Sequence, residues 1–546
     1  MESRATAKPI GKLNLQGLVL DESSRREIKS TAPSASGVRR TPCEEICESG
    51  RRKETSHVTF NPKECNLRRE DARACDDSVV KGHDDGVCSI RIPPYLKIGA
   101  YKSLLLYIET ASAYDYDEVL AKSILFYEAQ RSGVLPLTNR ISWRGDSCIN
   151  DKSHDGHDLS GGWYDAGDYV KFGLPMAWST TVLAWGVIAY KDAYLAAGQL
   201  EYMLDCIKWP ADYFLKCHTR KNEFYYQVGD GAEDHKRWGR AEEMDIERPS
   251  FKVTPSLPGS DVVGETVAAL SATAIAFKDA NKPYAALLLQ NAKELYDFAS
   301  TYRGIYPSKG HYQTKQYGCK LTWAAAWLYF ATSDKKYIRD AKKFYKEFKL
   351  SRSAWAFAWG NSGPAVQLLM YILTENEKYR TDFSNYLDSW LPGGKMPYTP
   401  KGLVYRSDWG PLRYAASNSF LALLASDYGV NPRNYREFAK KQLHYILGDS
   451  GRSFVCGFGK NPPKSPHHRA SSCPLPPHTT RRANLLADEP NPHTLYGGVV
   501  GGPGPLDNYV DDRRNYKMNE VACDYNAGFQ SAIAGLKHLE ITGQPF

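Results

Sequence analysis

The feature that most constrains the fold of this chain is a repeated alternation, after residue 114, between two kinds of helical stretch. Residues 262–280 are apolar on nearly every side, whereas residues 284–302 keep their apolar side chains on one stripe. The same alternation recurs over 321–332 and 336–348, 364–373 and 378–390, and 414–428 and 434–447, and an earlier apolar stretch covers 177–190. Because an all-apolar helix must be buried and an amphipathic helix needs water on one face, the pattern predicts an inner and an outer helical layer.

Two concentric helical layers are best satisfied when helical hairpins close into a ring. We therefore predict an all-α fold, an (α/α)6 barrel of six helical hairpins, for which roughly a dozen helices between residues 114 and 542 suffice. A helical solenoid is the alternative, but the irregular spacing and the long Gly- and Pro-rich loops argue against it. Those loops cover 132–175, 219–261, 391–413 and 450–524, and we expect them to build a cleft at one end of the barrel.

Aromatic content marks a boundary near residue 113. The chain has 36 Tyr, 19 Phe and 12 Trp, yet residues 1–100 contain only Phe60 and Tyr95. Burial of so little apolar area does not offset the conformational entropy that the chain loses on folding. We therefore predict that 1–113 is a low-aromatic, disordered extension and that 114–546 is the folded domain. The cysteines of the extension lack the spacing of a zinc module, and the later ones are expected to be core residues with one or two disulfides.

Charge and hydropathy exclude several classes of protein. The formal net charge is +8, but 70 basic and 62 acidic residues are mixed along the chain, so we expect no nucleic-acid partner. Apolar runs such as 182–190 fall well short of the roughly 18 residues that cross a membrane, so we expect no membrane span. The sequence after Met1 lacks the apolar core of a secretory signal, although 102–113 resembles a displaced one.

Two loops carry carboxylates at a spacing that suits chemistry. Asp165 and Asp168 lie in GGWYDAGDYVKFG, where two acids on a glycine-permitted turn can hold one water, with one of them acting as a base. The alternative is an Asx turn or an N-cap of the helix near residue 177. Glu520 lies behind Asp511 in NYVDDRRNYKMNEVACDYNAGF, and its alternative is a capping acid beside a solvated ion-pair network.

Further loop side chains point to a groove. They are His235, His467, His468 and Arg469, with Trp163, Trp238, Trp355 and Trp409 expected to be exposed platforms. Hydrolysis of a glycosidic bond needs such a groove with two opposed carboxylate groups, because one acid protonates the leaving oxygen and one base activates water. For each histidine the alternative is a buried imidazole bonded to the backbone.

Three segments of the chain closely resemble glycoside hydrolase family 9, the endo-β-1,4-glucanases of animals, plants and bacteria. They are the stretch from LAKSILFYEAQRSGVLP to GGWYDAGDYVKFGLPMAWS, then SFVCGFGKNPPKSPHHRA, and then YVDDRRNYKMNEVACDYNAGF. The last motif is the most specific, since Asp511, Glu520 and Asn526 stand at the family's spacing. Cys456 replaces a usual Val, Ser or Thr. The resemblance covers about 114–542 and implies the same six-hairpin barrel that the helix pattern predicts.

The resemblance also implies the roles of individual residues. Glu520 falls at the catalytic acid and Asp168 at the base, with Asp165 helping to hold the water, in a reaction that inverts the anomeric centre. Asp511 and His467 complete the implied catalytic set. The implied substrate-binding residues are His235, Trp355, Trp409, Arg413, Arg469 and Tyr525.

One departure from the family concerns calcium. Its members often bind a structural calcium through an Asp-Glu pair and an Asp that follows a distant Trp, but Cys319, Lys320 and Gly360 stand at those positions here. Since calcium takes about six to eight oxygen ligands, we expect no metal, and Lys320 would bring a positive charge near the vacated space. The resemblance implies no organic cofactor.

The expected function is that of an endo-β-1,4-glucanase, a cellulase that hydrolyses internal β-1,4-glucosidic bonds of cellulose or related β-glucans with inversion. A catalytically impaired β-glucan-binding protein of the same fold is the alternative, and the presence of Asp165, Asp168 and Glu520 counts against it. A helical scaffold would not explain the matched loop motifs. The expected partner is a β-1,4-glucan, bound by a monomer that family resemblance implies is secreted.

Overall fold

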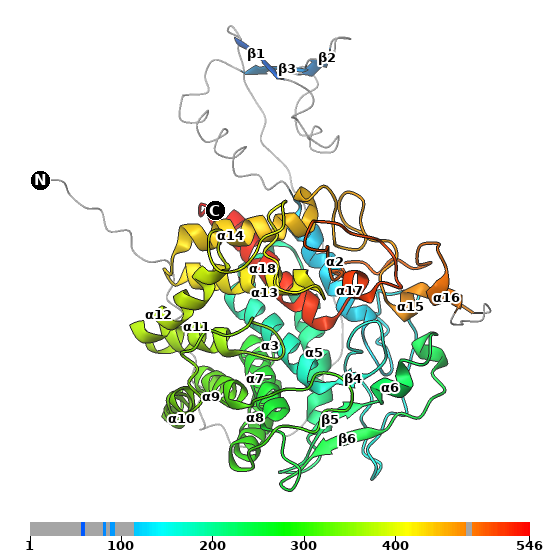
Figure 1. Cartoon of the computed structure of the whole chain (residues 1–546), viewed down its shortest axis with the longest axis vertical. Helices are drawn as coiled ribbons and strands as arrows, with labels where there is room; N and C mark the ends of the chain where they lie inside the picture. The colour runs from blue at the N-terminus through cyan, green and yellow to red at the C-terminus, as the bar shows by residue number, and fades with distance from the viewer. Residues whose placement is uncertain (1–55, 61–79, 83–87, 93–113, 477–482) are drawn as a thin grey trace, which may run out of the picture. The chain divides into compact units, whose positions relative to one another are not determined.

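The computed structural model describes residues 56–60, 80–82, 88–92, 114–476 and 483–546 (Figure 1). The described residues divide into two compact units, one that contains those between 56 and 92 and one that contains those between 114 and 546.

The described part of the smaller unit is a three-stranded antiparallel sheet. Its strands are β1 (Ser56–Phe60), β2 (Val80–Gly82) and β3 (Cys88–Ile92), in the order β1-β3-β2. Phe60 pairs with Cys88, and Val80 pairs with Ile90. The sequence did not lead us to expect these strands. The rest of 1–113 lies outside the described residues, and its disorder stays a prediction.

The larger unit is the predicted barrel, and its inner layer is a closed ring of six helices (Figure 1). These are α3 (Gly173–Ala189), α7 (Ser260–Phe277), α9 (Gly318–Thr332), α11 (Gly363–Thr374), α13 (Pro411–Asp427) and α18 (Cys523–Thr542). Each helix packs against the next one, and α18 packs against α3, which closes the ring.

An outer helix precedes each inner helix in the chain. The outer helices are α2 (Tyr116–Ala129), α5 (Leu200–Cys217), α8 (Lys282–Thr301), α10 (Lys335–Glu347), α12 (Glu377–Leu387) and α14 (Pro432–His444). The fold class and the assignment of apolar stretches to the inside are therefore confirmed.

The hairpin of α9 and α10 illustrates how the sequence builds the two layers. Every residue of α9 is buried except two near its C-terminal end, and the helix ends at Ser333 in the left-handed conformation (φ 59°). The side chain of Asp334 then caps α10 by accepting a hydrogen bond of 2.8 Å from the Lys336 amide. Only one stripe of α10, which includes Ile338 and Phe344, is buried. A tight turn thus joins an inner helix to an outer one.

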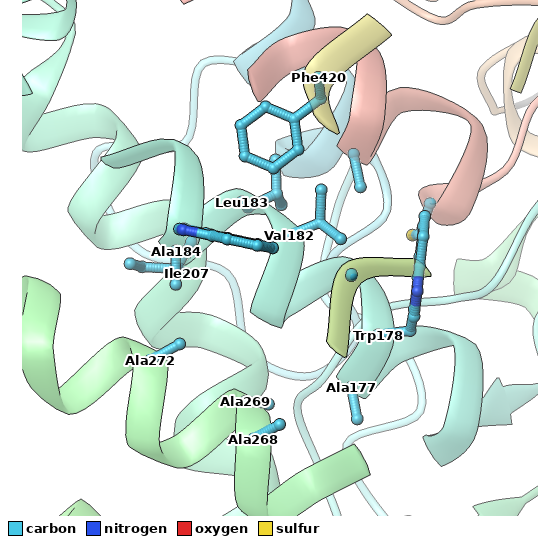
Figure 2. Packing of buried hydrophobic residues seen from close by; sticks show 14 of the residues in the cluster. Ala177, Trp178, Val182, Leu183, Ala184, Ile207, Ala268, Ala269, Ala272 and Phe420 are labelled. Atoms are coloured by element: carbon cyan, nitrogen blue, oxygen red, sulfur yellow. The ribbon is translucent and has the colours of Figure 1, made fainter. Parts of the chain in front are cut away.

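Large and small side chains fit together in the centre of the barrel. Figure 2 shows the buried large side chains Trp178 and Val182 of α3 in the same cluster as the small side chains Ala268 and Ala269 of α7. Small residues allow two helices to approach closely, while each buried large side chain contributes about 1.5–3 kcal/mol. Helix α7 is the one helix in the described ranges that is long and apolar enough to cross a membrane, but 89% of its apolar window is buried inside the barrel. It is a core helix.

A small antiparallel sheet lies in the loops between the early hairpins. It contains β4 (Lys171–Phe172), β5 (Phe224–Val228) and β6 (Ser250–Val253), in the order β4-β5-β6. We predicted loops here and missed the sheet, because its strands are short and pair only after the barrel has brought distant segments together. The short helices of the larger unit are α4 (Lys191–Ala196), α6 (Gly231–Asp234), α15 (Arg469–Ser472), α16 (Ala483–Leu486) and α17 (Tyr516–Asn519).

The cysteines of the larger unit correct one expectation. All seven of those described are free, and all are buried except Cys148, which is partly exposed. The one or two disulfides predicted among them are therefore not formed. The buried thiols pack as small apolar side chains, which confirms the expectation that these cysteines are core residues.

Candidate active site

Three loops that are far apart in the sequence are joined through their backbones at one place. The amide of His467 donates to the carbonyl of Asn519 (2.8 Å), and the amide of Arg469 donates to the carbonyl of Gly167 (3.2 Å). The amide of Cys523, at the start of α18, donates to the carbonyl of Asp165 (2.9 Å). The motifs that the sequence singled out therefore form one site.

The glycine of the Asp-Ala-Gly-Asp turn is what permits this close approach. A Cβ atom at Gly167 would lie 2.2 Å from the carbonyl oxygen of His467, well inside van der Waals contact. Gln130, the C-cap residue of α2, supports the same turn, because its side-chain amide donates to the carbonyl of Ala166 (2.6 Å). Helix α3 has no side-chain cap, so neither Asp165 nor Asp168 is the helix cap that the alternative interpretation required.

Asp168 is surrounded by groups that stabilise its charge. It is 8% exposed, and its Oδ2 lies 3.4 Å from Nε2 of His235. Its Oδ1 accepts the amide of Ala166 (3.2 Å). Burial alone would raise the pKa of Asp168, but the hydrogen bond and positive charge of His235 and the charge of Arg469 hold this pKa below its usual value. Asp168 is thus the carboxylate that stays ionised.

Asp165 has the opposite electrostatic character, although it lies only three residues away. Burial and the negative charge of Asp168 raise the pKa of Asp165 well above its usual value. The hydroxyl of Tyr312 donates a hydrogen bond to Oδ2 of Asp165. Sequence reasoning missed Tyr312, which lies in the loop before α9. No local pattern marks it, because only the ring closure brings that loop to Asp165.

Glu520 is held by two aromatic donors. Nε1 of Trp409 (2.7 Å) and the hydroxyl of Tyr525 (2.8 Å) both donate to its Oε2. Burial raises the pKa of Glu520, and these two hydrogen bonds only partly oppose it. Helix α18 has Ala522 at its N-cap and no side-chain cap, so Glu520 is not the capping acid of the alternative interpretation.

The predicted binding residues line the same region. Trp355 and Trp409 are 51% and 36% exposed, as platforms must be. Arg469 is buried and pairs with Asp234 across 2.7 Å, and its guanidinium lies over the Trp238 ring, 5.7 Å from the ring centre. A cavity of ≈ 180 Å³ lies beside Arg469 and is lined in part by Trp238.

His467 has one nitrogen committed to the fold. Its Nδ1 lies 2.5 Å from the carbonyl oxygen of Arg513, so Nδ1 carries the hydrogen and Nε2 remains for other partners. Burial lowers the pKa of His467, which keeps the imidazole neutral. The adjacent His468 bonds to Gln130 and is fully internal, with its pKa lowered by burial to about 3. His468 therefore follows the structural alternative.

Two predicted residues lie elsewhere. Asp511 accepts the amides of Lys464 (2.8 Å) and Ser465 (3.0 Å), so it supports the loop that leads to His467. None of its hydrogen bonds reaches a catalytic carboxylate. Trp163 was expected to be exposed, but it is 0% exposed, and its ring packs at an angle of 39° against that of Tyr127 in the core, with 4.8 Å between ring centres. That expectation was wrong, because the sequence of a loop does not indicate whether an aromatic side chain points to the core or to solvent.

One group of side chains in the described ranges has the spacing of a metal site. The ligand atoms of Asp168, Asp234 and His235 lie within 4.8 Å of one another. Arg469 already supplies a cation to Asp234, however, and His235 is bonded to Asp168. These contacts already give both carboxylates a partner within the protein.

Lys320 lies where the sequence departs from the family's calcium loop. It is fully buried, and its Nζ lies 2.5 Å from the Glu265 carboxylate of α7. The same ammonium donates to the carbonyl of Trp359 (2.6 Å) and to Oγ of Ser362 (2.9 Å). The absence of a metal stays a prediction, but a fixed cation with three oxygen partners ties α7 and α9 to the loop before α11.

The (α/α)6 barrel carries an ionised carboxylate, a carboxyl group of raised pKa and exposed tryptophans in one region. These features together define a glycoside hydrolase. Comparison with known proteins agrees. The family model "Glycosyl hydrolase family 9" matches residues 116–533, so the chain belongs to this family.

The relatives are named as endoglucanases. Endoglucanase B of Cellulomonas fimi is 45% identical over 447 residues, which are 78% of this chain and 42% of that protein. The chain thus spans less than half of that relative's length. The solved endoglucanase of the termite Nasutitermes takasagoensis is 48% identical and has a TM-score of 0.77, with 78% of this chain and 100% of that chain covered. The cellulase Cel9M of C. cellulolyticum in complex with cellobiose is 38% identical, with a TM-score of 0.74 over 78% of this chain and 99% of that one.

Proposed function

We propose that this family 9 enzyme is an endo-β-1,4-glucanase that hydrolyses internal bonds of cellulose or a related β-glucan with inversion, in a domain that covers residues 114–546. The observation that carries the proposal is the opposite electrostatic character of two carboxyl groups in one site. The pKa of Asp168 is lowered, and that of Glu520 is raised. One is prepared to accept a proton, and the other to donate one.

In the proposed reaction Glu520 protonates the glycosidic oxygen while Asp168 removes a proton from the attacking water. The raised pKa of Asp165 leaves a single negative charge on the Asp165–Asp168 pair, and the oxygens of Asp165 orient the second hydrogen of the water. Tyr312 holds Asp165 in place. Because water attacks opposite the leaving group of a β bond, the first product is the α anomer.

The platforms and basic residues support a glucan as the substrate. Trp355 and Trp409 offer exposed faces on which sugar rings stack. Arg413 and Arg469 offer hydrogen-bond donors to hydroxyls, and Nε2 of His467 offers an acceptor, because its Nδ1 holds the hydrogen that bonds to Arg513. The relative Cel9M binds cellobiose. By the same family relationship we propose that the enzyme is a secreted monomer.

The leaving group of the substrate tests the acid and the base separately. Glu520→Gln should nearly abolish hydrolysis of cellulose yet retain much of the activity on a dinitrophenyl cellobioside, whose leaving group needs no proton. Asp168→Asn should lose both activities by about 10²–10⁴-fold. Equal losses on both substrates in Glu520→Gln would overturn the assignment of the acid.

Stereochemistry tests the mechanism without a mutation. Proton NMR of the first minutes of cello-oligosaccharide hydrolysis should show the α anomer before mutarotation. An initial β product would require a retaining mechanism and a different role for Asp168.

A further inference from the structure

A buried carboxylate outside the predicted catalytic set lies four residues after Glu520 in the chain. Asp524 belongs to the first turn of α18 and is 1% exposed. Its Oδ2 lies 3.3 Å from Nη1 of Arg413 on α13. Its Oδ1 is also buried and has no hydrogen-bond partner among the described residues. A carboxylate with so few hydrogen bonds is costly to bury, so its presence calls for a reason beyond packing.

Arg413 connects Asp524 to the catalytic acid. Its guanidinium lies over the rings of Tyr414 (4.7 Å) and Tyr525 (4.9 Å), and its Nε is buried without a partner in the described ranges. The hydroxyl of Tyr525 donates to Glu520 across 2.8 Å. The four side chains Asp524, Arg413, Tyr525 and Glu520 therefore form one contiguous group at the junction of α13 and α18.

A positive charge in this place conflicts with the chemistry of Glu520. A nearby cation favours the ionised form of a carboxyl group, whereas a general acid must keep its proton until the glycosidic oxygen takes it. Arg413 lowers the pKa of Glu520, and Asp524 raises it. Asp165 and Tyr312 from neighbouring loops also face Glu520 and Asp524 and carry no positive charge. Arg406 faces the ring of Tyr414 but is not among the main charges that act on Glu520.

We infer that Asp524 is a positioning residue for the catalytic acid: by neutralising Arg413, it allows a guanidinium to serve the substrate site while Glu520 stays protonated. The inference rests on the proposed role of Glu520 as the acid. It assigns no proton transfer to Asp524 itself, which acts through Arg413.

The pH dependence of kcat/KM on a cello-oligosaccharide tests this inference, because its alkaline limb reports the acid of the free enzyme. In Asp524→Asn the charge of Arg413 is no longer compensated, so the alkaline limb should move about one pH unit lower. Activity on the dinitrophenyl cellobioside should change far less, since that substrate needs no acid. An unmoved limb in the folded variant, or an equal loss on both substrates, would overturn the inference.

A second variant keeps the test decisive if Asp524→Asn does not fold. In Arg413→Gln the charge of Asp524 is left uncompensated, so the alkaline limb should move to higher pH, whatever the effect on KM. In the double variant Arg413→Gln/Asp524→Asn the limb should return toward that of the wild type. Shifts in the same direction for both single variants would contradict the compensation.

Helix α13, which carries Arg413, also provides a matched control. Asp427 ends α13 and pairs with Arg436 across 3.6 Å, about 20 Å from Arg413 along the helix axis. Asp427→Asn should affect stability without moving the alkaline limb. Failure of the proposed function would show separately, since Glu520→Gln would then lose both substrates equally.

Discussion

The regions around Asp168 and Glu520 belong to the same joined loops, yet they shift the pKa of a buried carboxyl group in opposite directions. Asp168 has cationic neighbours, with His235 at 3.4 Å and the charge of Arg469 nearby. Glu520 has two neutral donors, Trp409 and Tyr525, on one oxygen, and the nearby charge of Arg413 is opposed by that of Asp524. Burial raises the pKa of a carboxyl group in both places, and at Asp168 the hydrogen bond and charge of His235, with the charge of Arg469, reverse this effect. The difference teaches that the partners of a carboxyl group, and not its depth, separate the base from the acid.

The largest effect should come from breaking both regions at once. Gly167→Ala would place a methyl group 2.2 Å from the carbonyl oxygen of His467, which forces the turn that carries Asp168 away from the His467 loop. The amide of His467 is bonded to Asn519, next to Glu520, so both carboxyl groups are displaced. A displacement of about 1 Å costs on the order of 10²-fold in rate, so kcat/KM should fall at least that far and the melting temperature should drop. Gly360→Ala is the control, because its Cβ would meet nothing within 4 Å. Equal behaviour of the two variants would mean that the loops are not held by this contact.

The buried ion pair of Lys320 and Glu265 shows what a charged partner contributes to stability, away from the catalytic carboxylates. In Lys320→Met the Glu265 carboxylate loses the cation that lies 2.5 Å away, and the free energy of unfolding should fall by about 3–5 kcal/mol. The double variant Lys320→Met/Glu265→Gln should recover most of this loss in urea denaturation.

The same pair tests the predicted independence from calcium. Because the ammonium of Lys320 already bonds to Trp359 and Ser362, melting curves of the wild type in excess chelator and in millimolar calcium should coincide. A calcium-dependent gain of several degrees would contradict the prediction.

A smaller effect should sharpen the account of the base. His235 holds the pKa of Asp168 down, so His235→Gln should raise that pKa. Activity is lost when the base becomes protonated, so the acidic limb of kcat/KM should move to higher pH, by about one unit. His311→Gln is a matched control, since the His311 ring lies 4.9 Å from that of His235 but makes no hydrogen bond to Asp168. A fall in kcat/KM without a shifted limb would leave His235 as a binding residue only.

The smallest effect is expected from the N-terminal extension, from which we predict no contribution to the surroundings of Asp168 or Glu520. Deletion of residues 1–110, which contain little aromatic or apolar area, should leave the thermal midpoint and the specific activity nearly unchanged. A loss of many degrees would show that the extension stabilises the barrel.

Much of the fold could be predicted because its signal is local. The apolar stretch that begins at Val262 became α7, and the amphipathic stretch that begins at Tyr284 lies within α8, since helical periodicity needs only neighbouring residues. The motifs around Asp165, Asp168 and Glu520 were recognisable for the same reason. The sheet of β4, β5 and β6 was missed because its pairing joins residues 22 to 57 positions apart in the sequence.

By itself, the sequence determined the alternation of inner and outer helices, the membership of the family and the identity of the acidic residues, because each of these is written in short continuous segments. Only the tertiary structure decided which carboxyl group is ionised, that Tyr312 reaches Asp165, that Trp163 faces the core and that Lys320 meets Glu265. The physical reason is that a pKa or an ion pair depends on charges and donors within a few ångströms, and closure of the ring brings those groups together from loops and helices far apart in the chain.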